Sequence, residues 1–319
     1  MDYQKLLSRL RHFGGFRLLW SYIRIGVGRV VIKEGLRLLL GRTSRDEAYS
    51  NIRIVVNQKL QARYVVFLRE RKSHYDGQEV KQKRSSKVWT CWLQGFEHAP
   101  ELVKACQASM KQWLTDREII QLDYNNYTDY VTLPDDIVQK YEKGYIPPAL
   151  FSDLLRLELL IQYGGTWMDA SILCTSGRDV EATMNCDLFM YQTKGQGAYR
   201  FRGASNWFIT SCCNNKLLMV LRDVLFRYWR EYSVTLDYYM FHDFFYAIAQ
   251  LYPAEVSAMP RKNRLLPLML MEHLGNSYDA IWMKELTDHV GFHKLSYRIP
   301  TEIKTDSNNF YHAIIHQKG

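Results

Sequence analysis

The most informative hydrophobic pattern runs from residue 146 to residue 171. Apolar residues fill most of the circumference between Pro148 and Gly164, which predicts a helix buried on nearly all sides. Pro148 suits the first helical position, where its missing N–H costs nothing. Gly164 and Gly165 predict the end of this helix, since one of them can adopt the left-handed conformation. A short strand of bulky residues then leads to Asp169.

Two polar residues interrupt this apolar helix on one face. Asp153 and Arg156 are three positions apart and therefore lie next to each other on the helix. Asp169 follows the strand, and ligands of open α/β sheets bind at the carboxyl ends of strands. A structural alternative is an ion pair within the helix that only stabilises the core. We favour a functional role, because buried charges are costly unless they are paired or used.

The remaining pattern alternates between strand and helix. Strand patterns lie at residues 87–92, 117–122 and 188–191, and helical patterns lie at residues 44–75, 100–113 and 217–232. This alternation predicts an α/β fold with a mostly parallel sheet. A polar stretch at residues 76–87 without periodicity predicts a linker. We therefore expect a mostly helical segment at residues 1–85 and one α/β domain at residues 86–319.

The motifs of the central stretch resemble those of a known enzyme class. Ser152-Asp153-x-x-Arg156, then Tyr163-Gly164-Gly165, then Trp167 two positions before Asp169, resembles the pattern of the "DXD" glycosyltransferases. The chain is most similar to the bacterial capsular polysaccharide synthesis branch related to glycosyltransferase family 32. The core of the large clostridial glucosylating toxins has the same interval between the matching aspartates. The resemblance covers about residues 86 to 300 and implies a GT-A-like, Rossmann-type sheet with flanking helices.

The resemblance also implies roles for individual residues. Asp153 and Arg156 would hold the hydroxyl groups of the donor sugar, and Asp169 would contact the ribose and a metal ion. Asp237 would contact the donor or acceptor sugar. Lys294 would neutralise the departing diphosphate. The other residues implied in nucleotide binding are Trp92, Gln94, Gly95, Gly165, Trp167 and Asn206.

Most of these residues also fit structural roles. Trp92, Gln94 and Gly95 fit core packing followed by a turn, and Asn206 fits an edge strand. Asp237 fits the cap of a helix, and Lys294 fits the basic end of a strand. The sequence leaves both sets of roles open for these residues.

The predicted metal site departs from the family pattern. The family has Asp-x-Asp, whereas this chain has Asp169-Ala170-Ser171. The resemblance implies Mn²⁺ or Mg²⁺ bound by Asp169 and Ser171, with His293 as a further ligand. A serine hydroxyl is a neutral and weaker ligand for these ions than a carboxylate. The departure at Ser171 leaves dependence on a metal open.

Positive charge is concentrated in the N-terminal part. Residues 1–87 contain 20 Lys and Arg against 7 Asp and Glu, a net charge of +13, whereas residues 88–319 contain 22 against 26, a net charge of −4. Cations interrupt the apolar clusters of residues 1–42, so no run of about 20 apolar residues could span a membrane. Glycines at residues 14–15 and at residues 26 and 28 predict several short helices in this region. Arg29, Lys33 and Arg37 form one cationic stripe, and a basic amphipathic helix with Phe16 and Trp20 is typical of membrane interfaces.

The alternative to membrane contact is a helical subdomain that packs on the main domain. No nucleic-acid fingerprint accompanies the basic residues, so we expect no nucleic-acid partner. The six cysteines form no CxxC pair and no signal peptide is apparent, which favours the cytoplasm, with peripheral attachment to the inner face of the membrane. A glycine-rich loop is expected at residues 195–203.

The resemblance implies transfer of a sugar from a UDP-sugar to a saccharide acceptor, with retention of the anomeric configuration. The implied acceptor is a lipid-linked intermediate of capsule or surface polysaccharide. One alternative is a glycosyltransferase that modifies a protein. Another is a catalytically degenerate module that binds a sugar nucleotide, with Ser171 marking the loss of catalysis. Release of UDP would distinguish an enzyme from such a module.

Overall fold

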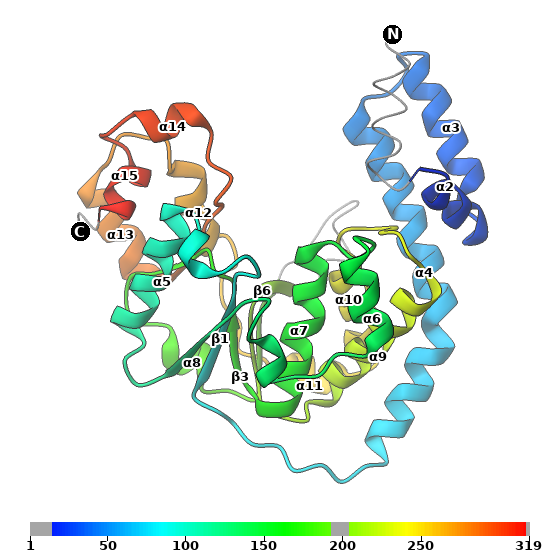
Figure 1. The fold of residues 1–319 in the computed structure, drawn as a ribbon, viewed down its shortest axis with the longest axis horizontal. Helices are drawn as coiled ribbons and strands as arrows, with labels where there is room; N and C mark the ends of the chain where they lie inside the picture. The colour runs from blue at the N-terminus through cyan, green and yellow to red at the C-terminus, as the bar shows by residue number, and fades with distance from the viewer. Residues whose placement is uncertain (1–14, 193–203, 317–319) are drawn as a thin grey trace.

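The structure of the protein is a computed structural model that describes residues 15–192 and 204–316. The glycine-rich segment at residues 195–203 lies outside these ranges. A central sheet lies between an N-terminal group of helices and a C-terminal group of helices, which are on opposite sides of the molecule in Figure 1. The predicted α/β class is confirmed.

The central sheet has five strands in the order β2-β1-β3-β6-β5. Their bounds are β1 (Lys87–Cys91), β2 (Glu118–Leu122), β3 (Gly165–Met168), β5 (Leu188–Gln192) and β6 (Ala204–Ser211). β1 is parallel to both β2 and β3, and β6 is antiparallel to both β3 and β5. Four strands therefore run in one direction and only β6 opposes them, so the predicted mostly parallel sheet is confirmed.

Alternating side chains of the strands divide the core into two layers, as expected for a sheet covered on both faces. Trp89 and Trp167 pack in the core that contains α7, α9 and α10, whereas Val88 and Met168 pack with Met110 of α5. The helices around the sheet are α5 (Glu101–Trp113), α6 (Asp135–Glu142), α7 (Pro148–Tyr163), α8 (Val180–Met184), α9 (Lys216–Glu231), α10 (Met240–Ala249) and α11 (Pro253–Ala258), with 3-10 turns η1 (Phe96–His98) and η2 (Tyr127–Asp129).

Two glycines, Gly164 and Gly165, connect the end of α7 to the start of β3. Gly164 and Gly165 both have positive φ, 69° and 96°. A Cβ atom at Gly165 would lie 2.3 Å from the backbone oxygen of Lys87, so only glycine allows β1 and β3 to approach this closely. Gly165 begins β3, at the opposite end of the strand from Asp169.

The N-terminal helices are α2 (Gly15–Arg24), α3 (Gly28–Leu39) and α4 (Arg45–Asp76). Gly26, with a φ of 78°, lies in the turn between α2 and α3. α4 packs against α9 and α10, and Val56, Leu60 and Tyr64 belong to the same buried core as α7 and α9. Residues 77–86 contain no helix or strand and connect α4 to β1. None of the helices in the described ranges has the length and apolar content to span a bilayer.

The C-terminal group contains α12 (Leu266–His273), α13 (Ala280–His289), β7 (Phe292–Lys294), α14 (Thr301–Thr305) and α15 (Phe310–Ile315). β7 pairs in antiparallel fashion with β4 (Ile172–Cys174), and Lys294 is the register partner of Ile172. Because β4 follows β3 almost directly, this pairing brings Lys294 to the carboxyl end of β3. The fold thus brings Lys294 into contact with Ser171, which lies 123 positions earlier in the sequence.

Candidate active site

A cleft of about 720 Å³ lies at the carboxyl ends of β1 and β3. Trp92 and Gln94, which follow β1, line one part of it, and Asp169 and Ser171, which follow β3, line another. α/β folds bind ligands at this edge of the sheet. We therefore treat this cleft as the candidate active site.

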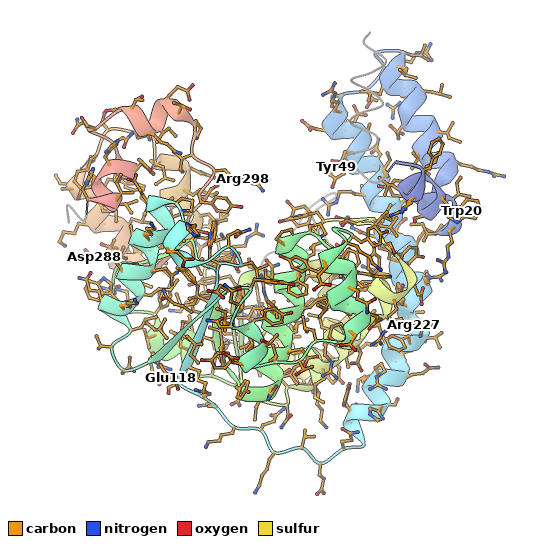
Figure 2. All side chains as sticks on the ribbon, viewed as in Figure 1. Trp20, Tyr49, Glu118, Arg227, Asp288 and Arg298 are labelled. Atoms are coloured by element: carbon orange, nitrogen blue, oxygen red, sulfur yellow. The ribbon has the colours of Figure 1, made fainter. Side chains whose placement is uncertain are left out.

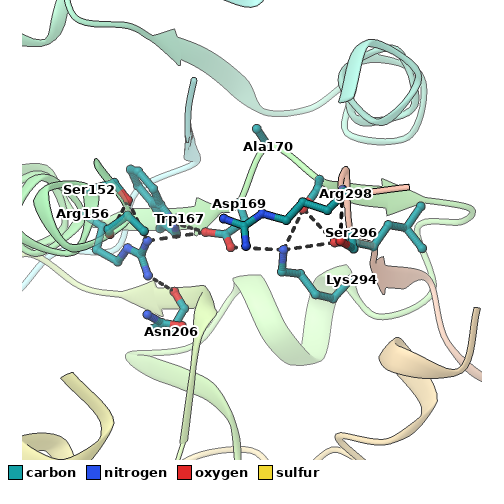
Figure 3. Close-up of polar contacts among 12 residues, drawn as sticks. Ser152, Arg156, Trp167, Asp169, Ala170, Asn206, Lys294, Ser296 and Arg298 are labelled. Carbon is teal, nitrogen blue, oxygen red and sulfur yellow. Dashed lines mark hydrogen bonds and ion pairs between the residues drawn. The ribbon is translucent and has the colours of Figure 1, made fainter. Parts of the chain in front are cut away.

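Arg156 is the centre of the polar network in the cleft (Figure 3). Its Nη1 lies 2.9 Å from Asp153 Oδ1 and donates a 2.6 Å hydrogen bond to the backbone oxygen of Asn206. Its Nη2 lies 3.5 Å from Asp169 Oδ1 and donates to Ser152 Oγ at 3.2 Å. The guanidinium group therefore fixes α7 relative to β6 and to the end of β3.

Asp153 is a buried carboxylate on the same face of α7. Burial raises the pKa of Asp153 to about 6, although the charge of Arg156 and a hydrogen bond from Asn206 act in the opposite direction. The Nδ2 of Asn206 donates this bond to Asp153 Oδ1 at 2.9 Å. The Asp153 side chain is therefore mostly ionised at pH 7 and becomes protonated in mildly acidic solution.

Asp169 is more open to solvent than Asp153, with 26% of its side chain exposed. Trp167 Nε1 donates a 3.0 Å hydrogen bond to Asp169 Oδ1, which fixes the orientation of the carboxylate. The ring of Trp167 also faces the guanidinium group of Arg156, with 4.8 Å from Cζ to the ring centroid. Asp169 can thus accept hydrogen bonds from a ligand while its charge is balanced by neighbouring cations.

Lys294 lies between the two residues that match the Asp-x-Asp motif. Its Nζ is 3.4 Å from Asp169 Oδ2 and donates to Ser171 Oγ at 2.7 Å and to the backbone oxygen of Leu295 at 3.2 Å. Ser171 Oγ donates its own hydrogen to the backbone oxygen of Leu295 at 2.9 Å. The pairing of β4 with β7 holds this arrangement in place.

These contacts do not fit a divalent metal site. The candidate ligands Asp169 and Ser171 already bind an ammonium group, and the charge of Asp169 is also balanced by Arg156. Divalent ions prefer several carboxylate or other oxygen ligands around one point. Within residues 15–192 and 204–316, no group of three or more His, Cys, Asp or Glu residues is arranged to hold a metal ion. Dependence on a metal stays a prediction, and no step below uses one.

His293 does not reach the cleft. It precedes Lys294 in β7, and successive side chains of a strand point to opposite faces. Its side chain is buried, and its Nε2 is 2.9 Å from Thr175 Oγ1. Burial lowers the pKa of His293 to about 4, so the ring is neutral at pH 7. The structure therefore separates His293 from Asp169 and Ser171.

Asp237 and the two predicted nucleotide-binding glycines also lie outside the residues that line the cleft. Asp237 is buried in an ion pair with Arg53 of α4. Gly165 allows β1 and β3 to lie close together, because it has no Cβ atom to contact the backbone of Lys87. Gly95 has a φ of 86° and closes a turn in which its N–H donates to the oxygen of Trp92 at 2.9 Å.

Trp92, Gln94 and Asn206 do line the cleft, together with Asp153, Arg156, Trp167, Asp169, Ser171 and Lys294. The Trp92 ring packs edge-on against Tyr297, with centroids 5.0 Å apart. Asn206 lies on β6. This strand is in the interior of the sheet, so the alternative role of Asn206 as an edge-strand residue is wrong. The sequence thus identified both carboxylates, Asp153 and Asp169, and two of the four cations, Arg156 and Lys294, among the lining residues of the described chain.

Several lining residues had not been identified from the sequence. Arg264 comes from the segment before α12 and Arg298 from the segment after β7, and Tyr238 and Tyr239 come from the segment before α10. Tyr238 and Tyr239 directly follow Asp237, so the resemblance indicated this part of the chain although Asp237 itself does not line the cleft. No motif or periodic pattern marks Arg264 or Arg298.

Comparison with known proteins gives three findings. A family model described as "Capsular polysaccharide synthesis protein" matches residues 37–314. No curated protein matches the chain. A solved structure titled "PaToxG Glycosyltransferase" is similar with 13% sequence identity and a TM-score of 0.39, over 84% of this chain and 97% of that chain.

Proposed function

Because the chain belongs to the capsular polysaccharide synthesis protein family, we propose that it transfers a sugar from a nucleotide-diphosphate donor to a saccharide acceptor. The proposed donor is a UDP-sugar, and the proposed acceptor is a lipid-linked intermediate of capsule or surface polysaccharide. We further propose retention of the anomeric configuration. The closer relation to glycosyltransferase family 32 that the motifs imply stays a prediction.

The observation that supports sugar transfer best is the network of Asp153, Arg156 and Asn206 in the cleft. A buried carboxylate beside a guanidinium group offers acceptors and donors at fixed positions, which suits the hydroxyl groups of a sugar ring. The residues of this network hold each other in place before a ligand arrives. Such preorganisation favours catalysis by positioning and by electrostatic stabilisation.

The neighbouring residues suit the nucleotide. Asp169, oriented by Trp167, would accept hydrogen bonds from the ribose hydroxyl groups. Trp92, which lines the cleft after β1, would offer an aromatic face to the base. The sugar would then lie next to Asp153 and Arg156, with the diphosphate close to Lys294.

Measurement of UDP release across a panel of UDP-sugars, with and without a saccharide acceptor, tests this proposal. We expect one donor to give UDP release that rises when the acceptor is added. A catalytically degenerate module would bind a sugar nucleotide and release no UDP. An enzyme that modifies protein would release UDP faster with a protein acceptor than with a saccharide, so acceptor profiling distinguishes the two kinds of transferase.

We also propose that α2 and α3 bind an anionic membrane surface. On α2, Phe16 and Trp20 are 91% and 68% exposed, whereas the buried residue is Ser21. On α3, Leu36 and Leu39 are more than half exposed, whereas Glu34 is only 3% exposed. Both helices thus expose large apolar residues to solvent, while Leu18 and Tyr22 of α2 and Val30 and Val31 of α3 pack against the core. Figure 2 shows Trp20 on the outer side of these helices, away from the sheet.

We define the apolar face of α2 and α3 as Phe16, Leu19, Trp20, Ile23, Ile32, Leu36 and Leu39, all exposed. Their spacing of three or four positions places them on one side of each helix. Arg17, Arg24, Arg29 and Lys33 are exposed around them. Apolar and aromatic residues surrounded by cations suit the interface of a bilayer that contains acidic lipid.

A further inference from the structure

The candidate active site holds an internal cation where the family motif would hold a metal ion. The ammonium group of Lys294 lies between Asp169 Oδ2 and Ser171 Oγ, at 3.4 Å and 2.7 Å (Figure 3). Ser171 replaces the second carboxylate of the motif, and its hydroxyl oxygen can accept a bond from an ammonium group without an additional negative charge. One carboxylate with one ammonium group therefore leaves this position neutral, as two carboxylates with one divalent ion would.

Two further cations line the same cleft without a carboxylate partner. Among residues 15–192 and 204–316, neither Arg264 nor Arg298 forms an ion pair with Asp or Glu. Arg264 Nε is buried and has no hydrogen-bond acceptor in the described part of the chain. Burial lowers the pKa of Arg264, and no neighbouring acid opposes this effect. A buried donor without an acceptor is costly unless a ligand supplies one.

The side chain of Arg298 points toward Asp169 and Lys294 in Figure 3. Arg298 comes from the segment directly after β7, whereas Arg264 comes from the segment directly before α12. The three cations thus reach the cleft from two segments of the C-terminal part, one that contains Lys294 and Arg298 and one that contains Arg264. Convergence of this kind is typical of a site for an anion with several oxygens.

The charge of the cleft differs in sign from that of the surrounding domain. Among its lining residues in the described part of the chain, four cations (Arg156, Arg264, Lys294 and Arg298) face two carboxylates (Asp153 and Asp169), which gives these six residues a net charge of +2. Residues 88–319 as a whole carry a net charge of −4. Positive charge is therefore concentrated where an anionic ligand would bind.

We propose that Lys294, Arg264 and Arg298 bind the diphosphate of the donor and stabilise its charge during transfer, so that the reaction needs no divalent metal ion. This inference rests on the proposed function. In the step, the bond from the anomeric carbon to the diphosphate oxygen breaks, and its electron pair stays on that oxygen. The acceptor hydroxyl oxygen forms the new bond to the anomeric carbon, and its proton passes to the departing diphosphate.

The experiment measures calorimetric binding of UDP and of inorganic pyrophosphate in EDTA, and turnover of the preferred donor in the same buffer. We expect the unaltered protein to bind both anions and to keep its activity in EDTA. Lys294→Met should weaken both bindings by roughly tenfold or more, because it removes a charge-assisted hydrogen bond. Lys284→Met, which removes an exposed lysine of α13, is the matched control and should change neither.

Lys294→Met also removes a partner of Asp169, so Arg264→Met provides a second test that leaves the Asp169–Lys294 pair intact. It should weaken pyrophosphate binding in EDTA as well. The proposal is overturned if binding of both anions is lost in EDTA, returns with Mn²⁺ and is unaffected by either substitution. If pyrophosphate binding depends on Lys294 and Arg264 but no UDP-sugar releases UDP, the cationic site stands and the proposed transfer fails.

Discussion

Arg53 of α4 and Asp237, in the segment before α10, form a buried ion pair with 2.7 Å between Nε and Oδ2. The side chains are only 4% and 0% exposed. Asp237 Oδ1 also accepts a 2.8 Å hydrogen bond from the backbone N–H of Tyr239. The Arg53 guanidinium lies 4.6 Å from the centroid of the Tyr239 ring. Because Tyr238 and Tyr239 line the cleft, α4 helps to hold one wall of the candidate active site.

Removal of the arginine should destabilise the whole protein. Arg53→Met leaves the Asp237 carboxylate buried without its partner, which costs about 3–5 kcal/mol in the free energy of unfolding. Denaturant unfolding followed by circular dichroism measures this loss. Arg63→Met, which breaks a more exposed pair with Glu231, is the control and should cost about 1 kcal/mol or less. Equal losses in the two variants would contradict the importance of the buried pair.

A double variant tests whether Asp237 contacts a sugar, as the family motif implies. Asp237→Asn keeps the acceptor for the Tyr239 N–H but removes the charge, so Arg53→Met with Asp237→Asn should recover part of the lost stability. If Asp237 only positions the segment before α10, a stable double variant keeps most of its kcat and shows a raised KM. If Asp237 contacts the sugar, kcat falls by orders of magnitude in the stable protein.

A neutral substitute for Asp153 should abolish most activity with little change in stability. Asp153→Asn keeps the shape of the side chain and removes the charge that would bind the donor sugar, so we expect kcat/KM to fall by orders of magnitude. The melting temperature should shift by only a few degrees. Glu158→Gln is the matched control, because Glu158 lies on the same helix and pairs with Arg222 outside the cleft. Full activity in folded Asp153→Asn would exclude a role for this carboxylate.

The same residue predicts a dependence on pH. The pKa of Asp153 is raised from 3.8 to about 6, so the ionised form is lost as the pH falls through about 6. If the proposed transfer needs the carboxylate, kcat/KM should fall about tenfold per pH unit below that value. Between pH 3.8 and 6 the folded chain keeps a proton that the unfolded chain has lost. This group therefore favours folding at low pH and loses that contribution as the pH rises through 6.

The fall in activity below pH 6 would consequently not reflect unfolding caused by Asp153. A profile of kcat/KM from pH 5 to 8, with circular dichroism at each pH, separates the two effects. The residual activity of Asp153→Asn should lack this limb of the profile. An identical limb in both proteins would assign it to another group.

Local patterns predicted the parts of the fold that depend on neighbours in sequence. The apolar circumference of α7, its Pro148 start and its glycine end follow from helix geometry, and the structure reproduces them. Asp153, Arg156 and Asp169 lie in or directly after these elements, so their meeting in the cleft could be anticipated. The rest of the cleft depends on contacts between distant segments.

Lys294 and His293 show most clearly that contacts between distant segments decide which side chains reach the cleft. The resemblance assigned both residues to the site, but strand geometry turns only Lys294 toward Ser171. The pairing of β4 with β7 that determines this orientation has no signal in the sequence of either strand. Arg264 and Arg298 reach the cleft through the packing of the C-terminal helices, which is equally invisible in local periodicity.

The apolar face of α2 and α3 leads to a test of membrane binding. Phe16→Glu with Trp20→Glu places two carboxylates on that face, which should repel acidic lipid and remove the aromatic contacts. We expect co-sedimentation of the unaltered protein with vesicles that contain phosphatidylserine, weakening as salt rises, because each exposed cation contributes about 1 kcal/mol. The double variant should stay in the supernatant. Trp113→Glu with Ile281→Glu, two exposed residues of α5 and α13, is the matched control and should bind as before. Binding that is unchanged by the α2 substitutions, or indifferent to acidic lipid, would show that this face does not bind an anionic membrane surface.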